Sequence, residues 1–143
     1  MKPFLGLDFG TKRVGVAKSD ELHLLAHPMG FIKRQSDDQV AMEVSRLVRE
    51  HEVAKIVVGM PKTMKGELKE KAGEVSAFII RLKQATGCDV VTWDERLTTV
   101  QAEKALIAQD VSRSKRRVKQ DAIAAEIMLQ SYLDFLKGAG RNQ

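Results

Sequence analysis

The sequence contains one cysteine, few aromatic residues and no long apolar run. A single cysteine, Cys88, excludes an internal disulfide, and no Cys/His spacing typical of a zinc site is present. The apolar runs are far too short to span a bilayer, and the first residues, Met1–Phe4, lack the apolar segment of a signal peptide. These absences predict a cytoplasmic protein that does not contact a membrane.

Internal repeats, low-complexity tracts and linkers rich in Pro, Gly or Ser are absent as well. Aromatic residues make up only 5% of the chain, which argues against extensive base stacking of the kind found in single-strand-binding proteins. Hydrophobic residues make up 43% and charged residues 30%, a balance typical of a folded globular protein. The sequence therefore predicts a single domain over residues 1–143.

The chain is basic, with a formal net charge of +5 and a pI near 9.4. An excess of this size indicates a polyanionic partner without identifying it. The densest positive charge lies in the run Arg113–Lys119. A run of this kind is often only a solvated loop, so both interpretations stand.

The segment Phe4–Asp20 predicts a strand, a tight turn and a second strand, because apolar residues alternate around glycines and Gly10–Arg13 interrupts the run. In the first strand, Asp8 shares a face with two glycines, Gly6 and Gly10. A carboxylate is costly to bury without a partner, and the glycines leave space above it. Asp8 is therefore interpreted as a site residue, with an ordinary turn or edge acid as the weaker alternative.

The remaining pattern alternates strands with helices, which indicates an α/β fold with a mixed sheet covered by helices. Apolar residues at helical spacing predict four helices. The first begins at Asp37, the second carries the stripe Val75–Leu82 and ends at Gly87, and the third runs from Thr98 to about Ala108. The last helix follows a basic segment, Gln109–Lys119. The further predicted strands are Ala26–Ile32, Lys55–Gly59 and Cys88–Trp93.

Three acids are candidates for one metal site: Asp8 in mid-strand, Glu95 at the C-terminal end of a strand, and Asp121 in the first turn of the last helix. A site made only of oxygens suits Mg²⁺ or Mn²⁺, and one or two such ions can activate a water against a phosphodiester. For Glu95 and Asp121 the alternative is that they only complement a helix dipole. Spacing alone does not show that the three acids meet.

Positively charged residues could hold the phosphates of a nucleic acid beside these acids. Lys12 and Arg13 follow Asp8, and Lys62 and Lys65 lie in the loop between Met60 and Gly66. The candidates in the basic run are Arg113, Lys115, Arg116, Arg117 and Lys119.

The motifs together resemble the YqgF family of Holliday-junction-resolvase-like proteins, regarded as nucleases that process precursor 16S rRNA. The matching pieces are Leu7–Ala17, Val58–Pro61 with Gly66, Asp94–Thr99 and Asp121–Ala125, in the order of the family and over essentially the whole chain. The resemblance implies a ribonuclease-H-like fold with a mixed five-stranded sheet flanked by helices.

The resemblance also implies that Asp8, Glu95 and Asp121 are the acidic, catalytic, metal-binding positions of a hydrolase that cleaves phosphodiester bonds. The implied substrate is RNA, the 5′ flank of precursor 16S rRNA during ribosome biogenesis. One departure is the loop Thr63–Glu67, where the family typically carries Asn-Met-Asp-Gly-Ser, so substrate contacts through that loop stay open.

Three alternatives remain. A Holliday-junction resolvase would act on structured DNA, although nothing in the sequence specifies the dimer interface of such enzymes, and we expect a monomer or weak dimer. A non-catalytic nucleic-acid-binding factor in RNA processing or transcription would use the same positive charge. The turn after Asp8 also resembles the phosphate-binding turn of actin-like and sugar-kinase ATPases, but 143 residues leave no room for their second domain.

Overall fold

The computed structural model describes residues 2–10, 12–60, 66–94 and 113–141. Within 66–72, 113–121 and 139–141 it describes the backbone only. No helix in these ranges is both long enough and apolar enough to span a membrane.

Five strands form one mixed sheet in the spatial order β3-β2-β1-β4-β5. Strand β1 (Phe4–Phe9) is antiparallel to β2 (Arg13–Ser19), and β2 is antiparallel to β3 (Ala26–Lys33). On the other side of β1, strands β4 (Lys55–Met60) and β5 (Asp89–Asp94) add in parallel. β1 is thus the central strand of the sheet. A strand covered on both faces normally carries a continuous run of apolar residues, which β1 interrupts with Asp8.

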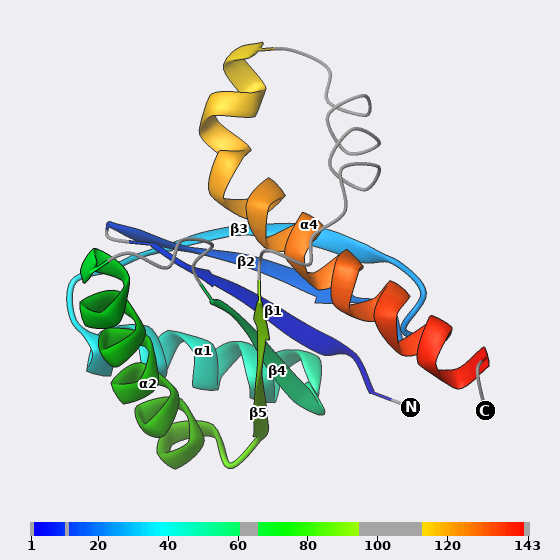
Figure 1. Cartoon of the computed structure of the whole chain (residues 1–143), viewed down its shortest axis with the longest axis horizontal. Helices are drawn as coiled ribbons and strands as arrows, with labels where there is room; N and C mark the ends of the chain where they lie inside the picture. The colour runs from blue at the N-terminus through cyan, green and yellow to red at the C-terminus, as the bar shows by residue number, and fades with distance from the viewer. Residues whose placement is uncertain (1, 11, 61–65, 95–112, 142–143) are drawn as a thin grey trace.

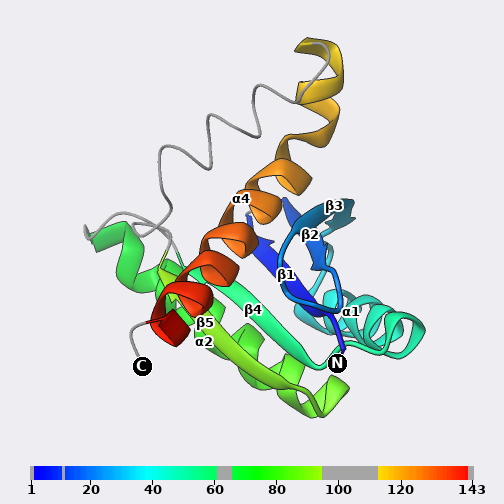
Figure 2. The same ribbon diagram turned by 90° about the vertical axis from the view of Figure 1, so that its right-hand side faces the viewer.

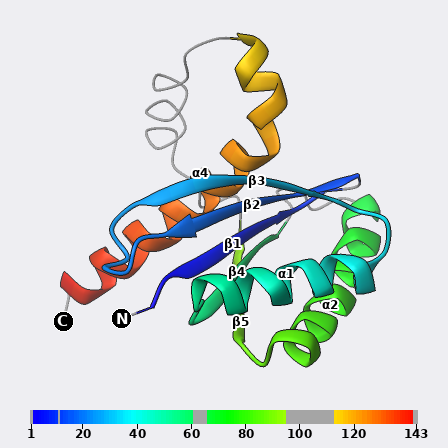
Figure 3. The same cartoon turned by 180° about the vertical axis from the view of Figure 1, so that it is seen from behind.

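Helices cover both faces of this sheet. Helices α1 (Asp37–His51) and α2 (Gly66–Thr86) lie on one face, and α4 (Arg113–Arg141) crosses the other (Figures 1 and 3). Ser36 caps α1 by accepting a hydrogen bond from a backbone N–H of the first turn, and Gly87 follows α2 with a φ of +68°.

The core under α1 and α2 is built from large side chains. Leu5, Leu7 and Phe9 of β1 point to this side, and the Phe9 ring lies 4.7 Å from that of Phe78 in α2. The fully buried members contributed by the flanking strands and helices are Val14, Ile56, Val58, Val40, Val44, Val75 and Leu82.

The strands contribute smaller side chains to the core under α4 than to the core under α1 and α2. Aromatic rings contact one another at one end of it. Ala17 and Val57 of the sheet meet Ala125 and Leu129 of α4. At the amino end of β1, Tyr132 contacts the rings of Phe4 and Trp93, with centroids 6.2 and 5.6 Å away.

The structure confirms most of the predicted elements to within one or two residues, including the hairpin, the strand from Ala26 and the helix from Asp37. The predicted helix from Thr98 to Ala108 lies outside the described residues.

The prediction that a basic segment, Gln109–Lys119, separates two helices is wrong from Arg113 onward, because α4 already begins there. Lys and Arg are good helix formers and the run holds no Gly or Pro, so its charge does not end the helix. The first turns of α4, drawn in yellow, extend beyond the sheet (Figure 2).

Candidate active site

Asp8 lies in the centre of the sheet, on the face covered by α4. Its direct neighbours across the sheet are two glycines, Gly15 of β2 and Gly59 of β4. Alternation along β1 places Asp8 on the face opposite Leu7 and Phe9, which belong to the core under α1 and α2. Asp8 is half-buried, and neither neighbouring strand places a side chain directly beside it.

Gly6 allows α4 to approach β1 closely. A Cβ at Gly6 would lie 2.9 Å from the Cβ of Leu129, a distance that real side chains do not adopt. The space beside Gly6, which was predicted to be open to a ligand of Asp8, is therefore filled by Leu129 of α4. Gly6 sets the distance between α4 and the sheet.

Helix α4 runs opposite to β1 (Figure 1). Two contacts give its register along the strand. Tyr132 lies beside Phe4, and Leu129 lies over Gly6. A strand rises about 3.3 Å and a helix about 1.5 Å per residue, so two strand residues match about four helix residues. By this register Asp8 is level with Ala125, and the backbone of Asp121 lies one helical turn beyond.

The prediction that Asp121 lies in the first turn of its helix is wrong, because α4 begins eight residues earlier, at Arg113, and has no acid in its first turn. The helix dipole acts only within the first turn. The alternative in which Asp121 merely complements that dipole is thereby excluded. Its side chain lies outside the part that the structure describes.

The turn that follows Asp8 is held by contacts that the sequence did not indicate. The Gly10 N–H donates to the Arg13 carbonyl at 3.0 Å, and a Cβ at Gly10 would lie 2.6 Å from that oxygen. The Arg34 guanidinium donates to the Gly10 carbonyl at 3.2 Å and lies 4.2 Å over the Phe9 ring. Arg34 therefore clamps the end of β1, a role that depends on the β2–β3 pairing and has no local sequence signal.

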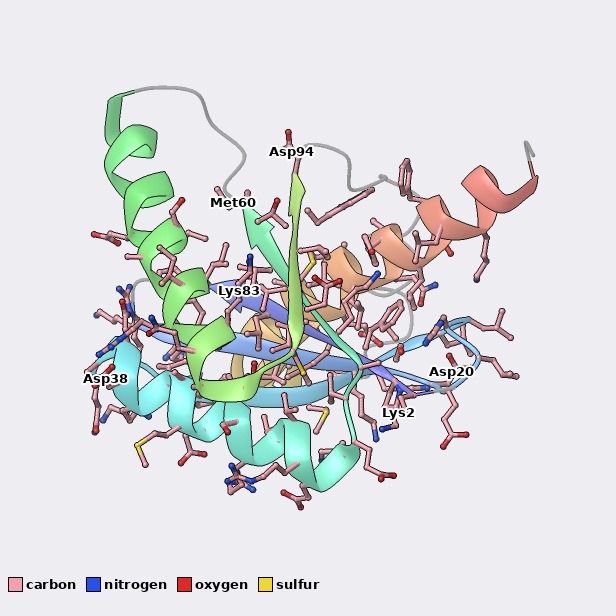
Figure 4. The ribbon with its side chains drawn as sticks, turned by 90° about the horizontal axis from the view of Figure 1, so that it is seen from below. Lys2, Asp20, Asp38, Met60, Lys83 and Asp94 are labelled. Carbon is pink, nitrogen blue, oxygen red and sulfur yellow. The ribbon has the colours of Figure 1, made fainter. Side chains whose placement is uncertain are left out.

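The carboxyl ends of β4 and β5 lie side by side at the same edge of the sheet, where Met60 pairs with Asp94 (Figure 4). In open α/β sheets, ligands bind outside these ends. Glu95 follows Asp94 in the chain and lies outside the described residues.

The predicted phosphate-binding residues are distributed over two regions. Lys12 and Arg13 are exposed in the β1–β2 turn and at the start of β2. Lys62 and Lys65 lie outside the described residues. The basic run is helical in backbone, with side chains outside the described part: Arg113, Lys115, Arg116, Arg117 and Lys119.

Comparisons with known proteins identify the family of this chain. The model of the RuvX family, described as Holliday junction resolvase, matches residues 2–135. The chain belongs to the RuvX family. This is the family, also known as YqgF, that the sequence motifs indicate.

RuvX relatives match nearly the whole chain. A protein of Desulforudis audaxviator (strain MP104C) is 37% identical over 138 residues, 96% of this chain and 97% of the relative. One of Clostridioides difficile (strain 630) is 46% identical over 131 residues, 92% of this chain and 93% of the relative. Each of the two is named "Putative pre-16S rRNA nuclease".

Solved resolvases share the fold of this RuvX chain. Thermus thermophilus RuvC in complex with a Holliday junction substrate superposes with a TM-score of 0.58 at 16% identity, covering 94% of this chain and 96% of RuvC. The fowlpox virus resolvase bound to Holliday junction DNA gives 0.57 at 15% identity, covering 94% and 98%. The predicted ribonuclease-H-like fold is confirmed.

The Asp8 carboxylate is of the donor type that suits a hard divalent cation. None of the ion pairs found between described residues includes the Asp8 carboxylate. Carboxylate oxygens without His or Cys are the ligands that Mg²⁺ and Mn²⁺ prefer. The described side chains contain no group of three possible ligands, since only one of the three predicted acids has a described side chain.

A buried acid on α4, Glu126, was not found by sequence reasoning. It follows Ala125, is only 9% exposed, and its pKa is raised because burial disfavours the charged form. It lies one turn before Gln130, which accepts from the Ala26 N–H at 2.8 Å, so the two share the side of α4 that faces β3. No periodicity signal separates such a position from a surface acid.

Proposed function

We propose that this chain is a metal-dependent nuclease that hydrolyses phosphodiester bonds. We propose Asp8, Glu95 and Asp121 as its catalytic ligands for Mg²⁺ or Mn²⁺. The observation that carries the proposal is the position of Asp8 on the central strand, between Gly15 of β2 and Gly59 of β4. An acid placed this way costs stability unless it binds something.

The strand order supports bringing Glu95 to Asp8. Only β4 separates β1 from β5, so the two backbones lie about 10 Å apart. The residue of β4 between them at this level is Gly59, which presents no side chain. Trp93, two residues before Glu95 in the chain, lies on the α4 face, the face of Asp8.

The register of α4 supports bringing Asp121 to the same place. Ala125 is fully buried and level with Asp8, and Asp121 is one turn away on the same side of the helix. The contact between Gly6 and Leu129 fixes this register, because a larger residue in β1 would displace the helix.

In this proposal the three carboxylates hold the cation, which when bound supplies an activated water and stabilises the leaving oxygen. Gly15 and Gly59 leave the sheet open beside Asp8, so a phosphate can approach the carboxylates. Lys12 and Arg13, together with the basic first turns of α4, hold the flanking phosphates without reading sequence.

The substrate we favour is precursor 16S rRNA, because relatives that match over nine-tenths of the chain are named "Putative pre-16S rRNA nuclease". The cleavage position at its 5′ flank and the cytoplasmic location are parts of the proposal that follow from the family resemblance. A four-way DNA junction is the second candidate. The description of the RuvX family and the junction-bound resolvases of the same fold favour it.

The test compares Asp8→Asn with Asp89→Asn, a matched change at an exposed acid at the opposite end of the sheet. The two variants and the unaltered protein are incubated with labelled precursor 16S RNA and with a four-way DNA junction, in Mg²⁺, Mn²⁺ or a chelator. Asp8→Asn should lower cleavage by at least about 100-fold, since even outer-shell changes at metal sites cost 10- to 100-fold.

Asp89→Asn should cleave like the unaltered protein. Cleavage that survives in Asp8→Asn, or in the chelator, would remove the metal site from the mechanism. Preference for the junction over the RNA would select the second candidate substrate.

A further inference from the structure

Phe31 is an exposed aromatic residue on the edge strand β3. Its exposed fraction is 45%, although a Phe side chain gains about 1.5–3 kcal/mol when it is buried. The neighbouring residue Ile32 is buried in the core under α1 and α2. Phe31 therefore points to the other face of the sheet, the face of Asp8.

A bulge in β3 puts Phe31 on that face. Ala17 pairs with Pro28 and Gly15 pairs with Phe31, so three steps on β3 match two on β2. Gly30 lies within the bulge and has a φ of +91°, a conformation that side chains other than glycine rarely adopt. Without the extra residue, Phe31 would face α1 and α2. Bulges of this kind re-aim side chains and are frequent beside active sites.

Phe31 lies in register with Asp8 across the sheet. Phe31 pairs with Gly15, and Gly15 pairs with Asp8, so the three residues form one row over β3, β2 and β1. Two strand spacings separate the ends of the row, about 10 Å. The residue between them has no side chain, so a chain of nucleotides could lie over it.

A cation accompanies the ring. The Arg13 guanidinium lies 5.6 Å from the centre of the Phe31 ring, and Lys33 pairs with Arg13 on the same face. A ring with a guanidinium over it presents an apolar surface and a positive charge at one place. This combination matches a nucleobase and its phosphate.

We propose that Phe31 is a stacking platform for one unpaired nucleobase, within about three nucleotides of the scissile phosphate at a rise of about 3.4 Å per base. The inference rests on the proposed nuclease function and deepens it. It assigns a preference for single-stranded nucleic acid next to the cleavage position. A protein partner is disfavoured because the ring stands among cations on the face that holds the catalytic acid.

The test measures binding, in a chelator, of a labelled single-stranded RNA of about 12 nucleotides, within the usual site size of such surfaces. Phe31→Ala should weaken binding by about 5- to 150-fold, the effect of removing one base–aromatic stack. Phe31→Trp should bind at least as tightly as the unaltered protein. The matched control is Met42→Ala on α1, because Met42 is 72% exposed on the opposite face of the sheet.

A scan with single abasic positions identifies the stacked base. At one position, removal of the base should weaken binding to the unaltered protein as much as Phe31→Ala weakens binding of the intact RNA. Removal of that same base should not lower the affinity of Phe31→Ala any further. An equal loss on intact and on every abasic RNA, or an affinity unchanged in Phe31→Ala, would overturn the proposal. A changed oligomeric state with unchanged RNA affinity would overturn it too and would assign Phe31 to a protein contact.

These outcomes are separate from the fate of the nuclease proposal, because binding in a chelator needs no cleavage. If Asp8→Asn still cleaves while the abasic scan behaves as expected, the catalytic assignment fails and the platform stands. If Asp8→Asn is inactive and Phe31→Ala binds normally, the platform fails and the nuclease stands.

Discussion

The two faces of the sheet are built differently. On the face of α1 and α2, strand β1 presents Leu5, Leu7 and Phe9, all buried in one apolar core. On the face of α4 the same strand presents Gly6, Asp8 and, beyond its end, Gly10, and the helix contributes a buried acid. In the proposed nuclease, one strand thus carries stability on one side and chemistry on the other.

This difference shows how a small domain separates the two tasks. A core of closely packed large side chains tolerates little change in volume. A site for a phosphate and a cation needs an open backbone and unpaired charge, both of which cost stability. Placing them on opposite faces of β1 lets each be altered with little effect on the other, and the following changes test that separation.

The largest expected effect is on the face of α1 and α2. Phe78→Ala should lower the free energy of unfolding by about 3–5 kcal/mol, because Phe78 is fully buried and its ring contacts that of Phe9. Urea unfolding measures the loss. Cleavage per folded molecule should be unchanged, and a folded but inactive variant would contradict the separation of the two faces.

A smaller loss is expected where α4 meets β1. Gly6→Ala should lower the free energy of unfolding by about 1–3 kcal/mol, because the new Cβ would meet the Cβ of Leu129 and push the helix away. Cleavage should fall too, since α4 carries Asp121. The control is Gly73→Ala in α2, where nothing lies within 4 Å and the helix should gain up to about 1 kcal/mol. Equal thermal melting of both variants would refute the close-approach argument.

A substitution of Gly30 in the bulge of β3 should lower the free energy of unfolding by about 1–2 kcal/mol. Gly30→Ala should be destabilising because of the φ of +91°, since nothing lies within 4 Å to clash. Gly30→Asn should cost less, because Asn adopts left-handed backbone more readily. If the two variants melt alike, backbone conformation is not the reason for the glycine.

The smallest effect concerns Glu126 and depends on pH. Its folded-state pKa is raised by burial, so the folded protein binds the proton more tightly than the unfolded chain does. Stability should therefore fall as the pH rises above about 4.5, the ordinary pKa of this group, until the folded-state pKa is passed. Glu126→Gln should remove this slope and gain up to about 1 kcal/mol at neutral pH, with little change near pH 4.

Thermal melts of Glu126→Gln and the unaltered protein across this pH range provide the comparison. Glu21→Gln, in the exposed turn after β2, is the control and should leave the slope in place. Parallel slopes for Glu126→Gln and the unaltered protein would mean that Glu126 is not desolvated in the folded state.

Local sequence patterns were enough to identify most secondary-structure elements and the candidate acid of the first strand. Alternation over Phe4–Phe9, the stripe from Val75 to Leu82 and the stop at Gly87 identified their elements, because side-chain periodicity and glycine geometry act over a few residues. The position of Asp8 between Gly6 and Gly10 on one face of its strand could be predicted for the same reason. The start of α4 at Arg113 was missed, because a charged run without Gly or Pro gives no local signal of where a helix begins.

The neighbours of Asp8 depend on pairing between segments that are far apart in the chain. The glycines at its sides come from β2 and β4, Gly6 faces Leu129 far along the chain, and Phe31 joins the row through a bulge. Each of these relations is a pairing register between distant segments. A register is fixed by which faces are buried against which helix, and the shift of one residue would turn every side chain of a strand to the other side.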